Sequence, residues 1–260
     1  MASLRAWDGH SPYDEDEFLG LVTDIYKILI RQGHFREEDI IWEGHKNLDL
    51  SVLDDPHLID PRVVSLMRKV PAGPQSCIVP NMQPVCFLYP GALVRSRDID
   101  GCGRPDGFLD QTNALPTVLL WLDGFEGRDP VLVLDVADNT VRQFDERFKG
   151  PHYLDYPAEH APTYLRRVLE NYRTAAWIGD HNGGVIETRP GYSSFGPELQ
   201  RIMIEDYHWP CESFRRQDWD RDIDGLVGRM IDAEFGREVR GEEVNQSAAT
   251  VPVLDPELFG

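Results

Sequence analysis

The segment from Arg95 to Gln111, RSRDIDGCGRPDGFLDQ, carries acidic residues at a spacing that could bind a cation. Asp98, Asp100 and Asp106 stand at relative positions one, three and nine of a calcium loop, with Gly103 at position six. Carboxylate oxygens at this spacing are ligands that Ca²⁺ prefers, and the glycine permits the sharp turn between them.

Two other positions of this segment do not fit the calcium pattern. Position five is Cys102, a soft thiol that a hard cation does not favour. Position twelve is Leu109, where the pattern requires a bidentate glutamate, and Asp110 follows one residue too late. Because Asp and Gly also shape surface turns, we interpret the segment as a turn and expect no cofactor. Calcium held by the three aspartates is the alternative.

A second polar cluster is GDHNGG, from Gly179 to Gly184. Asp180, His181 and Asn182 could bind a metal or transfer protons, as similar fragments do in two-metal phosphatases. The other fragments of that site are missing, so we interpret the run as a glycine-rich loop. Nucleophile-elbow and phosphate-loop motifs are also missing from the sequence, and a histidine paired in space with one of the cysteines cannot be identified from the sequence.

Helices are predicted at both ends of the chain. The first begins near Ser11 and Pro12, which suit its cap and first turn, and ends at Gly33. Asp60-Pro61 begins a second, short helix that Pro71 ends. Three more are expected from Pro162, from Pro197 and over Asp218–Phe235.

Between these helices the apolar pattern is typical of β-strands. Four strands are predicted, over Val85–Tyr89, Val118–Leu122, Val131–Val136 and Val141–Phe144. Asp138-Asn139 suits a tight turn between the last two, and the short connections favour an antiparallel meander over parallel crossovers. The sequence therefore predicts an α+β fold, mainly an antiparallel sheet with N-terminal and C-terminal helices.

The amino-acid composition limits which cellular compartment and which classes of binding partner are expected. With 45 acidic and 26 basic residues the net charge is −19, which disfavours nucleic acid and suits a basic protein partner. Four scattered cysteines and no apolar leader favour the cytoplasm. The uncharged run 70–94 contains five prolines, which excludes a membrane-spanning helix there. The oligomeric state is not indicated.

The order of these elements predicts a single α+β domain over residues 11–235. A flexible N-terminus over 1–10 and a flexible acidic tail over 236–260 would flank it. The tryptophans are expected in or near the core, because burying an indole contributes a few kcal/mol or so. They are Trp121, Trp177, Trp209 and Trp219.

Three stretches of the chain resemble a group of uncharacterised fungal proteins. The matching residues are Asp60, Pro61 and Val63, then Leu134, Asp135, Asn139, Val141 and Arg142, then Tyr207, Trp209 and Pro210. That group is similar, more distantly, to the SUKH superfamily of yeast cell-wall regulators and bacterial toxin-immunity proteins. The resemblance implies an α+β domain that works by binding proteins.

Two hypotheses for function follow. The first is an intracellular, non-enzymatic protein-binding or regulatory domain. The alternative is an enzyme without a standard motif, such as an isomerase, cyclase or hydrolyase, that needs only a pocket and a positioned acid or base. Its candidate catalytic residues are Asp98, Asp100, Asp123 and His181.

Overall fold

The structure is a computed structural model that describes residues 11–53, 59–74, 76–97, 117–122, 130–145, 156–180 and 182–239. The chain divides into two compact units, Met1–Val185 and Ile186–Gly260. Compactness alone does not test whether the units fold independently, so the single domain over 11–235 stays a prediction.

The predicted flexible ends fall largely outside the described residues. Residues 1–10 and 240–260 are not described. Residues 236–239, the first four of the predicted tail, belong to the C-terminal helix α6 (Arg216–Val239), so these four residues are helical.

The N-terminal helix α1 spans Glu15–Gln32 and has a different cap from the predicted one. Asp14, not Ser11, caps it, because the Asp14 carboxylate accepts hydrogen bonds from the backbone N–H groups of Asp16 and Glu17. The predicted stop at Gly33 is confirmed: its φ is 97°, in the left-handed region that glycine adopts without strain.

The proline-rich middle of unit 1 is less regular than predicted. Helix α2 spans Pro61–Lys69, capped by Asp60 as expected. The strand predicted over Val85–Tyr89 is wrong: only Gln83–Pro84 forms a strand, β1, and helix α3 follows over Pro90–Arg97. Prolines at both ends of the apolar run explain the difference, since proline cannot donate to a sheet ladder and begins helices well.

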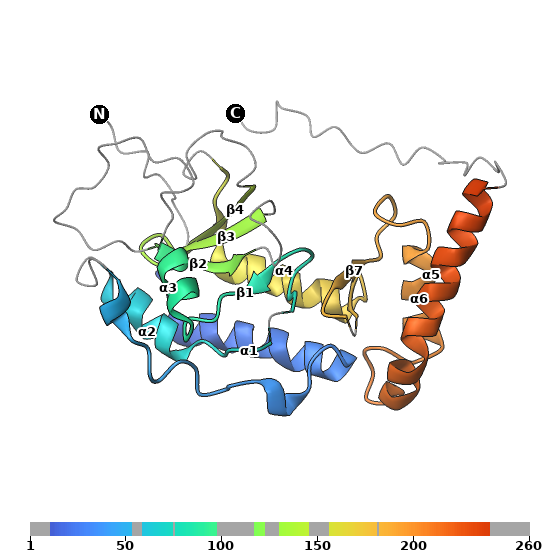
Figure 1. The fold of residues 1–260 in the computed structure, drawn as a ribbon, viewed down its shortest axis with the longest axis horizontal. Helices are drawn as coiled ribbons and strands as arrows, with labels where there is room; N and C mark the ends of the chain where they lie inside the picture. Colours follow the sequence, from blue (N-terminus) through green and yellow to red (C-terminus); the bar gives the residue numbers. More distant parts are fainter. Residues whose placement is uncertain are drawn as a thin grey trace. The chain divides into compact units, whose positions relative to one another are not determined.

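An antiparallel sheet forms the β part of unit 1, and this confirms the predicted α+β class and meander (Figure 1). The strand order is β1-β2-β3-β4-β5 and every neighbouring pair is antiparallel. The strands after β1 are β2 (Thr117–Leu122), β3 (Pro130–Asp135), β4 (Thr140–Asp145) and β5 (Glu159–His160). In the β3–β4 turn Asn139 has a φ of 53°, the positive angle that its residue type was expected to supply.

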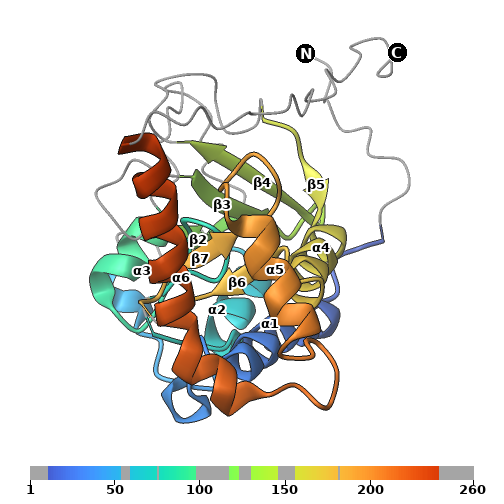
Figure 2. The same cartoon turned by 90° about the vertical axis from the view of Figure 1, so that its right-hand side faces the viewer.

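Helix α4 (Ala161–Arg173) lies beside α1, and strands β3 and β4 lie above both helices in Figures 1 and 2. Apolar side chains recur at helical spacing on the inner faces of both helices and pack with β3 and β4 into one core. The buried members from the two helices are Phe18, Val22, Ile25, Tyr26, Leu29, Ala161, Tyr164, Leu165, Val168, Leu169 and Tyr172.

The end of α1 is tied to a small two-stranded sheet of β6 (Trp177–Gly179) and β7 (Val185–Glu187). Buried Gln32 makes the connection. Its Nε2 donates to the carbonyls of Tyr172 and Trp177, each at 3.4 Å, and its Oε1 accepts from the Gly179 N–H at 3.1 Å. A buried amide that has partners on both of its ends fixes the α1–β6 geometry without an unpaired polar atom.

The second unit contains the predicted pair of C-terminal helices, α5 (Gly196–Glu205) and α6. The ring of Tyr207 meets the buried Trp219 edge-on, with 5.1 Å between centroids, and its hydroxyl donates to the Asp222 carboxylate at 2.8 Å. Trp209 and Trp219 are almost fully buried, as predicted for core residues. No described helix combines the length and apolar character needed to cross a bilayer.

Candidate functional site

An open groove of about 370 Å³ lies between the second half of α1 and the segment that follows it. We call it the Trp42 groove; its lining residues are Lys27, Ile30, Glu37 and Trp42. The volume is within the range of ligand sites, but the groove is open to solvent rather than enclosed. Such a shape suits a surface segment of another protein better than a sequestered small molecule.

Aromatic packing from the core holds Trp42 at this groove. The Tyr26 ring meets the indole at 77°, with 6.3 Å between centroids, and Tyr26 also packs on Phe35 at 5.7 Å. Tyr26 and Phe35 are buried, whereas Trp42 stays partly exposed. One edge of the indole is therefore anchored while the rest can meet a ligand.

The backbone beside Trp42 is also fixed. The Ile41 N–H donates to the Ala72 carbonyl at 2.8 Å, and the Ala72 N–H donates to the Ile41 carbonyl at 3.2 Å. Ile40 points into the core, yet the side chain of Ile41 is 47% exposed. An aliphatic side chain held outward by a fixed backbone loses little conformational entropy when a partner covers it.

Acidic side chains surround these two apolar residues. Residues 36–46 contain four acids and two bases, a local net charge of −2 with His45 neutral. Arg36 binds Asp39 at 2.9 Å, and Lys46 binds Glu43. Within the described part of the chain, Glu37 in the groove has no ion-pair partner. Its carboxylate can therefore receive a cationic group from outside.

Lys27 adds a positive group to the lining of the groove. It pairs with Asp24 one turn earlier on α1, at a long 3.9 Å, with both side chains more than half exposed. Such a pair contributes little to stability, so Lys27 can turn to a partner carboxylate or carbonyl at small cost. The groove thus combines two apolar side chains, Ile30 and Trp42, with one hydrogen-bond acceptor and one donor.

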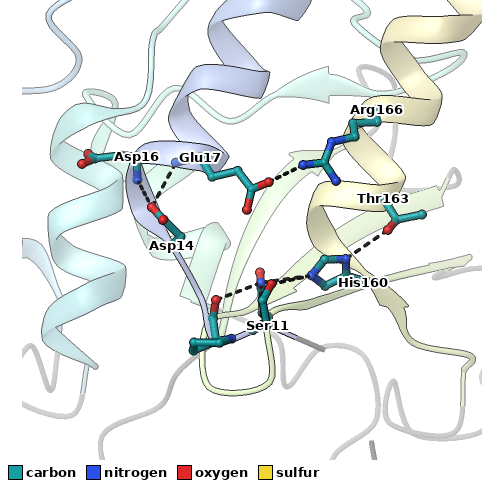
Figure 3. Close-up of polar contacts among 9 residues, drawn as sticks. Ser11, Asp14, Asp16, Glu17, His160, Thr163 and Arg166 are labelled. Atoms are coloured by element: carbon teal, nitrogen blue, oxygen red, sulfur yellow. Dashed lines mark hydrogen bonds and ion pairs between the residues drawn. The ribbon is translucent and has the colours of Figure 1, made fainter. Parts of the chain in front are cut away.

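A different polar cluster joins the starts of α1 and α4 and includes a serine–histidine contact (Figure 3). Ser11 Oγ is 3.5 Å from His160 Nε2, and the Asn139 amide nitrogen is 3.3 Å from the same ring nitrogen. His160 Nδ1 lies 3.0 Å from the Thr163 hydroxyl. Since the Asn139 amide is nearer to the Nε2 lone pair than Ser11 is, this histidine is poorly placed to act as a base for the serine.

The same cluster serves the packing of the two helices. The Asn139 amide nitrogen also donates to the backbone carbonyls of Ser11 and Pro12, at 3.1 and 3.3 Å. Glu17 of α1 pairs with Arg166 of α4, as Figure 3 shows. The cluster therefore connects the β3–β4 turn, the approach to α1 and the start of α4.

The residues predicted to bind calcium or to catalyse lie outside the described part of the chain. They are Asp98, Asp100, Asp106, Asp123 and His181. Calcium binding and catalysis by these residues stay predictions. Among the residues that are described, no three His, Cys, Asp or Glu side chains gather as a metal ion would require.

The described residues of the GDHNGG run stabilise the backbone of their own loop. One Asp180 carboxylate oxygen accepts hydrogen bonds from the N–H groups of Asn182 and Gly184, both at 2.8 Å. A side chain at Gly179 would collide with His34, because an added Cβ would lie 2.5 Å from the His34 Cβ. Asp and Gly here shape a loop, in agreement with its interpretation from the sequence.

Comparison with known proteins adds no assignment. The sequence matches no described protein family, no curated protein and no solved structure. The similarity to SUKH proteins stays a prediction.

Sequence reasoning did not single out Ile41 and Trp42. The signal that could have found them is Ile40-Ile41-Trp42, three large apolar residues flanked by Asp39 and Glu43. Only one of two consecutive apolar side chains faces the core when the backbone is extended, so such a run predicts an exposed neighbour.

Proposed function

We propose that this protein is a non-enzymatic protein-binding module, acting inside the cell, that recognises a basic segment of a partner through the Trp42 groove. The observation that carries the proposal is a groove lined by a partly exposed Trp42 and by Glu37, which has no ion-pair partner among the described residues, with the outward Ile41 next to Trp42 in the chain. An apolar side chain of the partner would cover Ile41 and Trp42, while a Lys or Arg would meet Glu37.

Charge supports a basic partner. The chain carries a net charge of −19, and its field attracts a cationic segment before contact. The same field repels the phosphate backbone of nucleic acids. Binding through the groove should therefore weaken as salt is added, because exposed charges are screened over about 8–10 Å at physiological ionic strength.

The state of the cysteines supports a reducing compartment. Cys86 is a free thiol. Disulfides are rare in the cytosol and common in secreted proteins, so free thiols agree with an intracellular protein.

The enzymatic alternative, an isomerase, cyclase or hydrolyase, stays a prediction. Its candidate residues Asp98, Asp100, Asp123 and His181 lie outside the described residues. A catalytic acid or base whose pKa is shifted by burial needs an enclosed site, and the Trp42 groove is open to solvent.

A peptide-display selection against the intact protein tests the proposal. We expect selected peptides to combine Lys or Arg with apolar residues. Their affinity, measured by fluorescence anisotropy, should fall at least about tenfold in Ile41→Asp and in Glu37→Lys, a loss of about 1.4 kcal/mol or more.

Tyr192→Ser is the matched control, because Tyr192 is 68% exposed and belongs to the other unit. It should leave the affinity unchanged. Selected peptides without basic residues, or an affinity that Ile41→Asp leaves intact, would contradict the proposal.

A further inference from the structure

Two residues far apart in the sequence, His45 and Cys86, meet inside unit 1. The distance from Cys86 Sγ to His45 Nε2 is 3.9 Å, within reach of a hydrogen bond to sulfur. A thiol beside an imidazole nitrogen is the arrangement by which proteins activate a cysteine nucleophile.

The tautomer of His45 is set by its other nitrogen. Nδ1 lies 2.8 Å from the carbonyl oxygen of Met67, which can only accept, so Nδ1 carries the hydrogen. In the neutral ring Nε2 is then a bare acceptor that faces the Cys86 sulfur. The Phe87 ring packs edge-on against the imidazole, at 83° and 5.4 Å, and fixes its orientation.

Burial keeps this imidazole neutral. His45 is fully buried, and burial lowers its pKa from the ordinary value, although the hydrogen bond to Met67 acts in the opposite direction. Cys86 itself is partly exposed, whereas His45 beside it is fully buried.

A third polar group lies close to the pair. The Tyr26 hydroxyl is buried and meets no partner with hydrogen-bond geometry among the described residues, although the Gly73 backbone lies near it. Burial raises the pKa of Tyr26, and a negative charge on Cys86 raises it further, so the phenol keeps its proton.

We propose that Cys86 is a peroxide-reactive thiol and that His45 is the base that takes its proton. The proton moves from Sγ to Nε2, and the thiolate attacks one oxygen of hydrogen peroxide. The S–O bond forms as the O–O bond breaks, and the leaving hydroxide takes the proton from His45 as water. Cysteine is oxidised to sulfenic acid, peroxide is reduced, and a second thiol can restore the site.

The test uses the full chain, treated with hydrogen peroxide and a 1,3-dione that traps sulfenic acid, with each cysteine quantified by mass spectrometry. Cys211 is the internal reference because it is exposed. We expect trapping at Cys86 to be at least about tenfold faster than at Cys211 despite its lower exposure. His45→Gln should remove most of that difference and leave Cys211 unchanged.

The pH profile of the unaltered protein tests the same point without a buried substitution. The ratio of the Cys86 to the Cys211 rate should be largest near pH 7 and shrink toward pH 9, where hydroxide replaces His45 as the base. A Cys86 rate equal to or below that of Cys211, or a ratio independent of pH, would overturn the proposal. Fast alkylation of Cys86 by iodoacetamide without any trapped sulfenic acid would overturn the assignment to peroxide. These readouts do not depend on the Trp42 groove.

Discussion

Gly44 lies in the short segment that presents Trp42 outward and His45 inward, so its replacement by alanine tests the geometry of both sites. Its φ is +67°, and a Cβ added there would lie 2.4 Å from the Arg68 carbonyl oxygen and 2.7 Å from the Lys69 carbonyl carbon. A left-handed angle costs an L-residue about 1–2 kcal/mol. Pushing packed backbone apart costs typically about 1–3 kcal/mol more. We expect Gly44→Ala to lose about 2–5 kcal/mol of unfolding free energy.

Gly20→Ala is the matched control. Gly20 lies within α1, and nothing is within 4 Å of a Cβ added there. Alanine should stabilise this helical position by roughly 0.5–1 kcal/mol. Thermal unfolding followed by far-UV circular dichroism and by tryptophan fluorescence checks both variants.

For a chain of this size each kcal/mol shifts the midpoint by about 2–4 °C, so Gly44→Ala should unfold about 4–20 °C lower than the unaltered protein. Two probes are needed because two compact units need not unfold together. A Gly44→Ala variant within about 1 °C of the unaltered protein, with Gly20→Ala behaving as expected, would refute the description of this loop.

Two further predictions concern buried polar groups. Burial lowers the pKa of His45 in the folded protein, so as the pH falls below about 6.5 the imidazole is protonated more readily in the unfolded chain than in the folded one. Protonation therefore favours the unfolded chain, and His45 makes the protein less stable at pH 5.5 than at pH 7.5. Urea unfolding should show a smaller difference between these two pH values in His45→Gln, and an identical difference would argue against a buried neutral imidazole. Gln32→Ala removes three buried hydrogen bonds and should cost roughly 2–3 kcal/mol in the same assay, whereas Glu38→Ala on the exposed surface should stay within about 0.5 kcal/mol. Equal effects of these last two substitutions would contradict the role assigned to Gln32.

Local signals predicted much of the fold. The apolar period of α1, its Gly33 stop and the Asp60-Pro61 start of α2 are each set by neighbours in the chain, and each is observed. The β3–β4 turn follows from Asp138-Asn139 for the same reason. Where two local signals competed, the prediction failed: Ser11 and Asp14 can both cap a helix, and only packing of the approach to α1 decides between them.

The sites depend on contacts that no local pattern encodes. His45 and Cys86 meet because the chain returns past α2 in the proline-rich segment, and that path was misread as a strand over Val85–Tyr89. Trp42 is exposed because Tyr26 and Phe35 already fill the core beside it. Both arrangements follow from tertiary packing, which overrides residue-type preferences.

Hydrogen exchange measured with and without a selected basic peptide tests the central claim most directly. Protein binding through the Trp42 groove predicts added protection over residues 36–46 and the second half of α1, lost in Ile41→Asp and reduced by added salt. Protection confined to Ile186–Gly260, or undiminished by Ile41→Asp, would contradict it.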